Sequence, residues 1–139
     1  MPARILMGAS ALFLAALGVA ATFAPQEVWA KLEAGNGHPL AGASAAVLLL
    51  QVAGGLFLGF AILNWSTRDM QFGGIYNRPL LLGNFLHFVV VAMALLRIVG
   101  NGRTEPVLLV LAGAYTVFAV AFGWRMYRAP PRQDNSVGT

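Results

Sequence analysis

Three polar side chains that could do chemistry lie within or at the ends of long apolar segments. Asn64 stands at the end of one such segment, and Asn84 and His87 stand three residues apart near the start of the next. Residues at this spacing share one face of a helix. An ionisable group placed in lipid costs free energy and is therefore a functional hypothesis by default. We predict that these three side chains form a polar layer inside a bundle of helices.

His87 has three alternative interpretations. Imidazoles and amides between membrane helices often only join them, at about 0.6 kcal/mol each, and we favour this structural role. Ligand binding or proton handling is the second alternative. Haem or metal ligation is the third, but a b-type haem normally needs a second axial ligand, and no other apolar segment holds a histidine. We therefore predict no metal site and no cofactor.

The carboxylates that acid–base catalysis would need are absent from the apolar segments. Cysteine is also absent, which removes thiolate metal sites and a cysteine nucleophile. The acidic residues all fall in connecting segments or in the tail: Glu27, Glu33, Asp69, Glu105 and Asp134. We predict no catalytic residue and favour a protein that is not an enzyme.

A second polar layer is expected farther along the same helices. At about 1.5 Å of rise per residue, Gln51 lies roughly 21 Å from Trp65 along its helix. Tyr115 and Thr116 should lie near the same level. We predict that Gln51, Tyr115 and Thr116 form this upper layer.

Two glycines four residues apart, Gly55 and Gly59, form a motif that lets another helix approach closely. The motif is also common by chance in apolar segments. We predict that these glycines pack against a helix of the same bundle, with a dimer face as the alternative.

The elements that must position these residues are membrane spans. Hydrophobic residues make up 58% of the chain and charged residues 10%, against about 25% charged residues in soluble domains. Mean hydropathy is +0.71. The apolar residues form blocks long enough for the roughly 20 residues of helix that cross a bilayer. The predicted spans cover residues 4–24, 40–65, 79–100 and 106–128.

The predicted fold is all-α, a four-helix transmembrane bundle in a single domain over residues 1–128. A short interfacial helix is expected after the first span, because Pro25 suits a first turn and apolar residues then recur on one side. The polar, proline-rich tail 129–139 is predicted to be disordered. A cleavable signal peptide is the alternative for the first span, but its apolar run exceeds the usual length of roughly 7–15 residues.

The net charge of +4 does not indicate nucleic-acid binding, because no basic patch is interleaved with stacking aromatic residues on a soluble domain. With four spans, the termini and the middle loop share one side. That side holds most of the basic residues: Arg4, Arg68, Arg78, Arg125, Arg128 and Arg132. The other side holds Lys31, Arg97 and Arg103. Arginine is enriched in cytoplasmic segments, so we predict a multi-pass protein with both termini in the cytoplasm.

The second and third spans are joined by a short loop and are expected to form an antiparallel hairpin. This arrangement would bring Asn64 beside Asn84 and His87. Arg68 and Arg78 would stand at the rim and attract an anionic headgroup. We therefore predict a cytoplasm-facing ligand cleft lined by the polar layer.

Two stretches carry a family resemblance: Phe-Leu-Gly-Phe-Ala-Ile-Leu-Asn-Trp-Ser-Thr-Arg-Asp at 57–69 and Leu-Leu-Leu-Gly-Asn-Phe at 80–85. With the arrangement of spans, they resemble small uncharacterised bacterial inner-membrane proteins, most nearly the DoxX-like four-helix proteins. The resemblance is one of size and layout over residues 1–128, and no chemistry-bearing motif comes with it. It implies a bacterial inner membrane, and some relatives of that group accompany quinone-linked oxidoreductases.

We expect a non-enzymatic accessory protein or a bundle that binds lipid or a small molecule. The alternative from another class is an oligomeric carrier or channel, and a third is a quinone- or haem-associated redox subunit. The expected partners are membrane lipids, and either other membrane subunits or further copies of the chain.

Overall fold

The structure is a computed structural model that describes residues 3–33, 43–69 and 77–128. This part of the chain is helical and holds no strand. Its helices are α1 (Ala3–Phe23), α2 (Pro25–Glu33), α3 (Ala43–Thr67), α4 (Asn77–Gly100) and α5 (Pro106–Arg128). Four of them, α1, α3, α4 and α5, are long and apolar enough to cross a membrane. The predicted all-α fold with four spans is confirmed. The predicted disordered tail, 129–139, lies outside the described residues.

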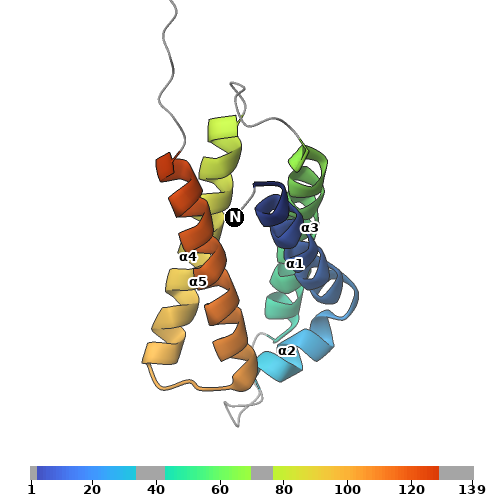
Figure 1. Cartoon of the computed structure of the whole chain (residues 1–139). Helices are drawn as coiled ribbons and strands as arrows, with labels where there is room; N and C mark the ends of the chain where they lie inside the picture. The colour runs from blue at the N-terminus through green and yellow to red at the C-terminus, as the bar shows by residue number, and fades with distance from the viewer. Residues whose placement is uncertain (1–2, 34–42, 70–76, 129–139) are drawn as a thin grey trace, which may run out of the picture.

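The four long helices pack as two antiparallel pairs (Figure 1). The closest backbone contacts join α1 to α3 and α4 to α5. Among the described residues, no Cα of α3 lies within 8 Å of a Cα of α4. As predicted, the second and third spans run antiparallel and bring Asn64 to Asn84, but they meet through side chains without close backbone contact. The chain between them is long enough to let them stand apart, and each packs against a different partner.

The contact between α1 and α3 is close because two glycines face each other there. A Cβ atom at Gly54 would lie 2.8 Å from the backbone nitrogen of Thr22, and one at Gly18 would lie 3.0 Å from the Gly54 oxygen. No real side chain tolerates such distances without backbone movement. Glycine at these two positions lets the helix backbones touch, which maximises van der Waals contact where lipid gives no hydrophobic driving force.

The prediction that Gly55 and Gly59 form a contact within the bundle is wrong. Both are exposed, and a Cβ atom at either would meet nothing within 4 Å. Gly54 precedes Gly55 by one residue, which on a helix is a rotation of about 100°. The face of α3 that meets α1 therefore holds Gly54, and the predicted motif lies on the outer surface of the bundle.

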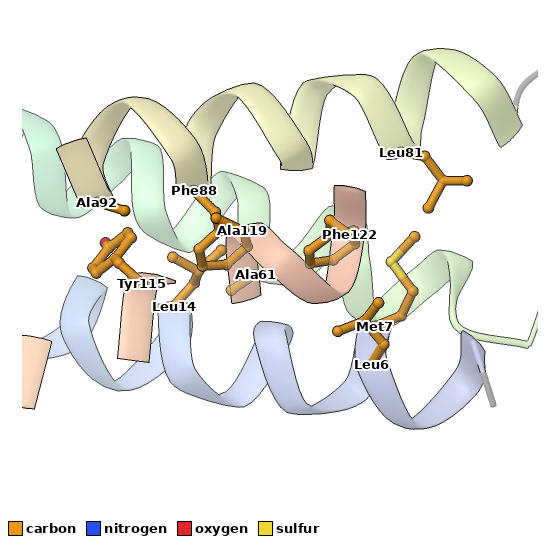
Figure 2. Close-up of a cluster of buried hydrophobic side chains, with 10 residues drawn as sticks. All are labelled: Leu6, Met7, Leu14, Ala61, Leu81, Phe88, Ala92, Tyr115, Ala119 and Phe122. Carbon is orange, nitrogen blue, oxygen red and sulfur yellow. The ribbon is translucent and has the colours of Figure 1, made fainter. Parts of the chain in front are cut away.

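Aromatic side chains fill the space between the two pairs. The Phe88 ring stacks on Phe118 and Phe122 at centroid distances of 4.9 and 5.4 Å, and Phe13 of α1 meets the edge of Tyr115 at 5.3 Å. Figure 2 shows the buried core, to which every long helix contributes side chains: Leu6, Met7, Leu14, Ala61, Leu81, Phe88, Ala92, Tyr115, Ala119 and Phe122. The pairs therefore meet largely through side chains, with a close backbone approach between α1 and α5.

The two ends of the bundle differ in their polar contacts. At one end, α2 crosses beside the turn between α4 and α5 (Figure 1). There the Arg103 guanidinium donates to the Leu32 carbonyl and to a Glu105 carboxylate oxygen, the latter at 3.1 Å. At the other end α1 and α4 begin and α3 and α5 finish. We call it the basic end because it holds Arg4, Arg68, Arg78, Arg125 and Arg128.

Candidate functional site

Asn64 and Asn84 face each other between α3 and α4. The Asn64 amide nitrogen donates to the Asn84 carbonyl oxygen at 2.6 Å, and the Asn84 amide nitrogen donates back at 2.8 Å. Both residues are 0% exposed. Lipid offers no hydrogen-bond partners, so buried amides in a membrane bundle turn toward protein groups. Here each of the two amides hydrogen-bonds to the other.

The remaining donors of this pair are also used. The Asn64 amide donates to the Ser10 hydroxyl oxygen at 3.1 Å, and that hydroxyl donates to the Met7 carbonyl at 2.9 Å. The second Asn84 donor goes to the Leu80 carbonyl at 3.0 Å. Each amide thus has both donors and its acceptor satisfied. The cluster Ser10–Asn64–Asn84 ties α1, α3 and α4 together and leaves no free group for a ligand.

The predicted cleft does not form around this cluster. The two asparagines are fully buried, and neither bonds to His87. Arg68 is not a free rim residue, because it contacts Asp69 at 3.2 Å and lies 3.6 Å over the Trp65 ring. Arg78 stands on α4, in the other helix pair, and is exposed. The asparagines close against each other because reciprocal hydrogen bonds satisfy them without a ligand.

His87 lies one turn deeper than Asn84, among aromatic rings from three helices. Its ring stacks on Phe60 of α3 at 5.0 Å and meets the edges of Phe57 and Phe88 at 5.7 and 5.2 Å. The side chain is half-buried, and its Nε2 atom is buried without a hydrogen-bond partner in the described part of the chain. Buried polar atoms almost always have a partner, so this atom needs an explanation.

Tyr115 of α5 is a second unpartnered group beside His87. Its ring is 5.9 Å from the imidazole, between centroids, and the residue is only 2% exposed. Its hydroxyl is buried and makes no hydrogen bond to any residue that the structure describes. We refer to His87 and Tyr115 with their aromatic neighbours as the His87–Tyr115 site. These neighbours are Phe13, Phe57, Phe60 and Phe88.

The chemistry open to the His87–Tyr115 site is hydrogen bonding inside an apolar surround. An imidazole and a phenol can each donate or accept one hydrogen bond. Stacked rings offer flat apolar contact to a ligand. Within the described part of the chain, no group of three or more histidine, cysteine, aspartate or glutamate side chains could hold a metal ion. The site therefore suits a mainly apolar molecule with a carbonyl or hydroxyl group.

The predicted upper polar layer does not assemble. Gln51 is exposed and donates to the Thr22 carbonyl of α1 at 3.3 Å, while Thr116 donates to the Ala112 carbonyl of its own helix at 2.7 Å. Tyr115 bonds to neither. Gln51 lies on the surface and Tyr115 in the core, because equal depth does not bring side chains to the same face.

Sequence reasoning missed Ser10 and the pairing of His87 with Tyr115. Ser10 is the one hydroxyl in the first half of α1, and depth counted along the helix from Arg4 places it near the level of Asn84. Depth along the helices alone places Tyr115 at the level of Gln51, in the other polar layer. The rings around His87 come from α3, α4 and α5, so only the packing of the helices determines which of them contact it.

Comparison with known protein families, with curated proteins and with solved structures finds no match for this chain.

Proposed function

We propose that this chain is a non-enzymatic integral membrane protein that binds a small, mainly apolar molecule at the His87–Tyr115 site. The ligand has a carbonyl or hydroxyl group that takes up the hydrogen bonds of His87 Nε2 and the Tyr115 hydroxyl. We further propose that the protein resides in a bacterial inner membrane with both termini in the cytoplasm, and that it acts beside other membrane subunits or further copies of itself.

The observation that carries this proposal is the contrast between two buried polar groups of the same bundle. At Ser10–Asn64–Asn84 every donor is satisfied within the chain. At the His87–Tyr115 site, two buried polar atoms have no hydrogen-bond partner among the described residues. Leaving such an atom unsatisfied costs about 1–3 kcal/mol. A bound molecule that hydrogen-bonds to both atoms removes this cost.

The arrangement of helices supports entry of a ligand at this level. α3 and α4 meet through side chains, and the His87 ring sits between their aromatic residues. Separating two stacked rings costs about 0.5–1.5 kcal/mol per pair beyond the area exposed. An apolar molecule that enters from the lipid replaces the stacking contact that the separated rings lose. We therefore propose that the ligand enters between the helix pairs without unfolding of the protein.

A non-enzymatic role is supported by the residues that the spans contain. The site has an imidazole and a phenol. The described spans hold no carboxylate that could orient the imidazole or stabilise its protonated form, since Glu33, Asp69 and Glu105 all lie outside them. General acid–base catalysis with a histidine normally relies on such a partner. The proposed orientation follows from the arginine excess at the basic end.

The test is mass spectrometry of the protein extracted in mild detergent and ionised intact. The wild-type protein should carry an additional small mass. Tyr115→Phe and His87→Phe should lose it while remaining folded, since each replaces a ring with a ring of similar size. Thr116→Val is the matched control, because it removes a hydroxyl that bonds only to its own helix. A wild-type protein that carries nothing but water, or variants that retain the mass, would contradict the proposal.

A further inference from the structure

A separate feature, on the outer surface of α4 and α5, is an apolar groove near the basic end. It is a shallow, open groove of about 420 Å³, lined by Phe85 and Val89 of α4 and by Val120, Gly123 and Trp124 of α5. Its walls carry almost no polar surface. In a membrane this groove faces the acyl chains of the lipid, and it is independent of the His87–Tyr115 site and of the function proposed for it.

The groove keeps its depth because α4 and α5 approach closely at Gly123. A Cβ atom at Gly123 would lie 3.0 Å from a ring carbon of Phe85. The phenylalanine ring therefore lies against the α5 backbone. Any side chain at this position would push the ring outward.

Aromatic residues place the end of the groove at the membrane surface. Trp124 and Tyr127 line it on the last turns of α5, and both are exposed. Tryptophan and tyrosine concentrate at the level of the lipid headgroups. The apolar part of the groove thus lies just inside the hydrocarbon, where the upper part of an acyl chain runs.

Two arginines stand at this end of the groove. The Arg128 guanidinium lies 4.4 Å over the Trp124 ring. Arg78 precedes Phe85 by seven residues, so it stands two turns closer to the basic end on the same face of α4. Within the described residues, neither forms an ion pair, whereas Arg4 and Arg68 share Asp69 and Arg103 pairs with Glu105. The mouth of the groove is therefore positively charged and not neutralised by these carboxylates.

We propose that the groove holds an acyl chain of an anionic phospholipid whose phosphate is bound by Arg78 and Arg128. Basic pockets between membrane helices, at the level of the headgroups, recognise anionic lipids in this way. A second copy of the chain fits less well. A two-fold contact through this face would bring the same two arginines of both copies to one membrane level, with no described carboxylate to offset the repulsion.

The test uses purified wild-type protein incubated with phosphatidylglycerol or phosphatidylcholine of identical acyl chains, followed by mass spectrometry of the intact complexes. We expect phosphatidylglycerol to be retained preferentially. Arg78→Gln and Arg128→Gln should each lower this preference about fivefold, the effect of one basic residue near an anionic surface. Arg97→Gln, an exposed arginine at the opposite end of α4, is the control and should leave it unchanged.

A second pair of variants tests the groove itself. Val120→Phe fills the groove from an exposed position that is 66% accessible, so the fold should tolerate it. Val110→Phe is the control, at a position 70% accessible on the same helix but outside the groove. Val120→Phe should lower occupancy by phosphatidylglycerol several-fold, and Val110→Phe should not. Equal retention of the two lipids, unchanged occupancy in Val120→Phe, or a dimer that Val120→Phe abolishes would each overturn the proposal.

Discussion

Asn64 and Asn84 exchange two hydrogen bonds, of 2.6 and 2.8 Å, across the interface between the two helix pairs. Because α3 and α4 make no close backbone contact, this reciprocal pair is the main polar link between them. It fixes the depth at which the helices face each other. It also determines which residues meet one turn farther in, where His87 contacts Phe60.

The first prediction concerns the energetic coupling of this pair. Asn84→Leu leaves the Asn64 carbonyl oxygen and one donor without partners, so it should lower the free energy of unfolding by about 1–2 kcal/mol. Asn64→Leu should act similarly. The double variant should lose less than the sum, because neither amide is then left unsatisfied. The free energy of unfolding of the two single variants and of the double variant can be measured in mixed detergent micelles. Gln51→Leu, which removes an exposed amide, is the control. Strictly additive losses of stability in the double variant would show that the two asparagines do not depend on each other.

The second prediction distinguishes two sets of glycines. Gly54→Leu and Gly18→Leu should force α1 from α3 and lower the melting temperature strongly, since overpacking a tight contact costs about 1–3 kcal/mol or more. Gly55→Leu and Gly59→Leu place the same side chain in open space and should have little effect on the monomer. Thermal melting in detergent measures the difference. Equal melting temperatures for Gly54→Leu and Gly55→Leu would contradict the packing of α1 on α3.

The third prediction concerns the hydroxyl of Tyr115. Because it has no hydrogen-bond partner among the described residues, Tyr115→Phe should leave the stability of ligand-free protein unchanged or raise it by up to about 1 kcal/mol. A hydroxyl with a structural hydrogen bond would instead cost about 0.5–1.5 kcal/mol when removed. Unfolding of the protein after exhaustive detergent exchange measures this quantity. A clear loss of stability in Tyr115→Phe would assign the hydroxyl a structural role.

The fourth prediction concerns Glu105 at the turn before α5. A hydrogen bond from its own backbone amide, and then the Arg103 guanidinium, hold the pKa of this carboxyl below its ordinary value of 4.5. The ionised form therefore favours the folded state. This stabilisation is present above pH 4.5 and is lost as the pH falls through the lowered pKa of the folded protein. Melting between about pH 6 and pH 3 should show a steeper acid decline for wild type than for Glu105→Gln, and parallel curves would contradict the prediction.

The fifth prediction concerns the proposed orientation. The chain has no cysteine, so single cysteine variants can be labelled on a clean background. Ser66→Cys, at the basic end, should react with an impermeant reagent only after the membrane is made permeable. Asn101→Cys, at the opposite end, should react in intact cells. The reverse pattern would place the basic end outside.

The spans could be predicted from the sequence, whereas the faces on which the helices meet could not. Span length and hydropathy are local properties, and all four predicted segments form helices long enough to cross a membrane. In lipid every face of a helix can be apolar, so the pattern that would orient a soluble helix is missing. For this reason Gly55 and Gly59 were chosen, while Gly54 makes the contact.

The candidate site could likewise be predicted only in part from the sequence. Asn64 and Asn84 were expected to turn inward because lipid gives amides no partners, and the structure places them in contact. The sequence gives no sign that they satisfy each other completely, which removes the predicted cleft. Nor does it reveal that His87 faces Tyr115 and Phe60. That arrangement depends on the pairing of helices, which brings residues far apart in the chain to one level.

The most direct test of the proposed binding site is the ¹⁵N resonance of His87 Nε2. The chain has only two histidines, His38 and His87, so selective labelling gives few signals, and His87→Phe assigns them. We predict that the Nε2 signal of gently extracted protein reports a hydrogen bond, and that this signal shifts after exhaustive exchange into fresh detergent while His38 is unchanged. An Nε2 signal that is identical before and after exchange would show that His87 holds no removable ligand and would contradict the proposed function.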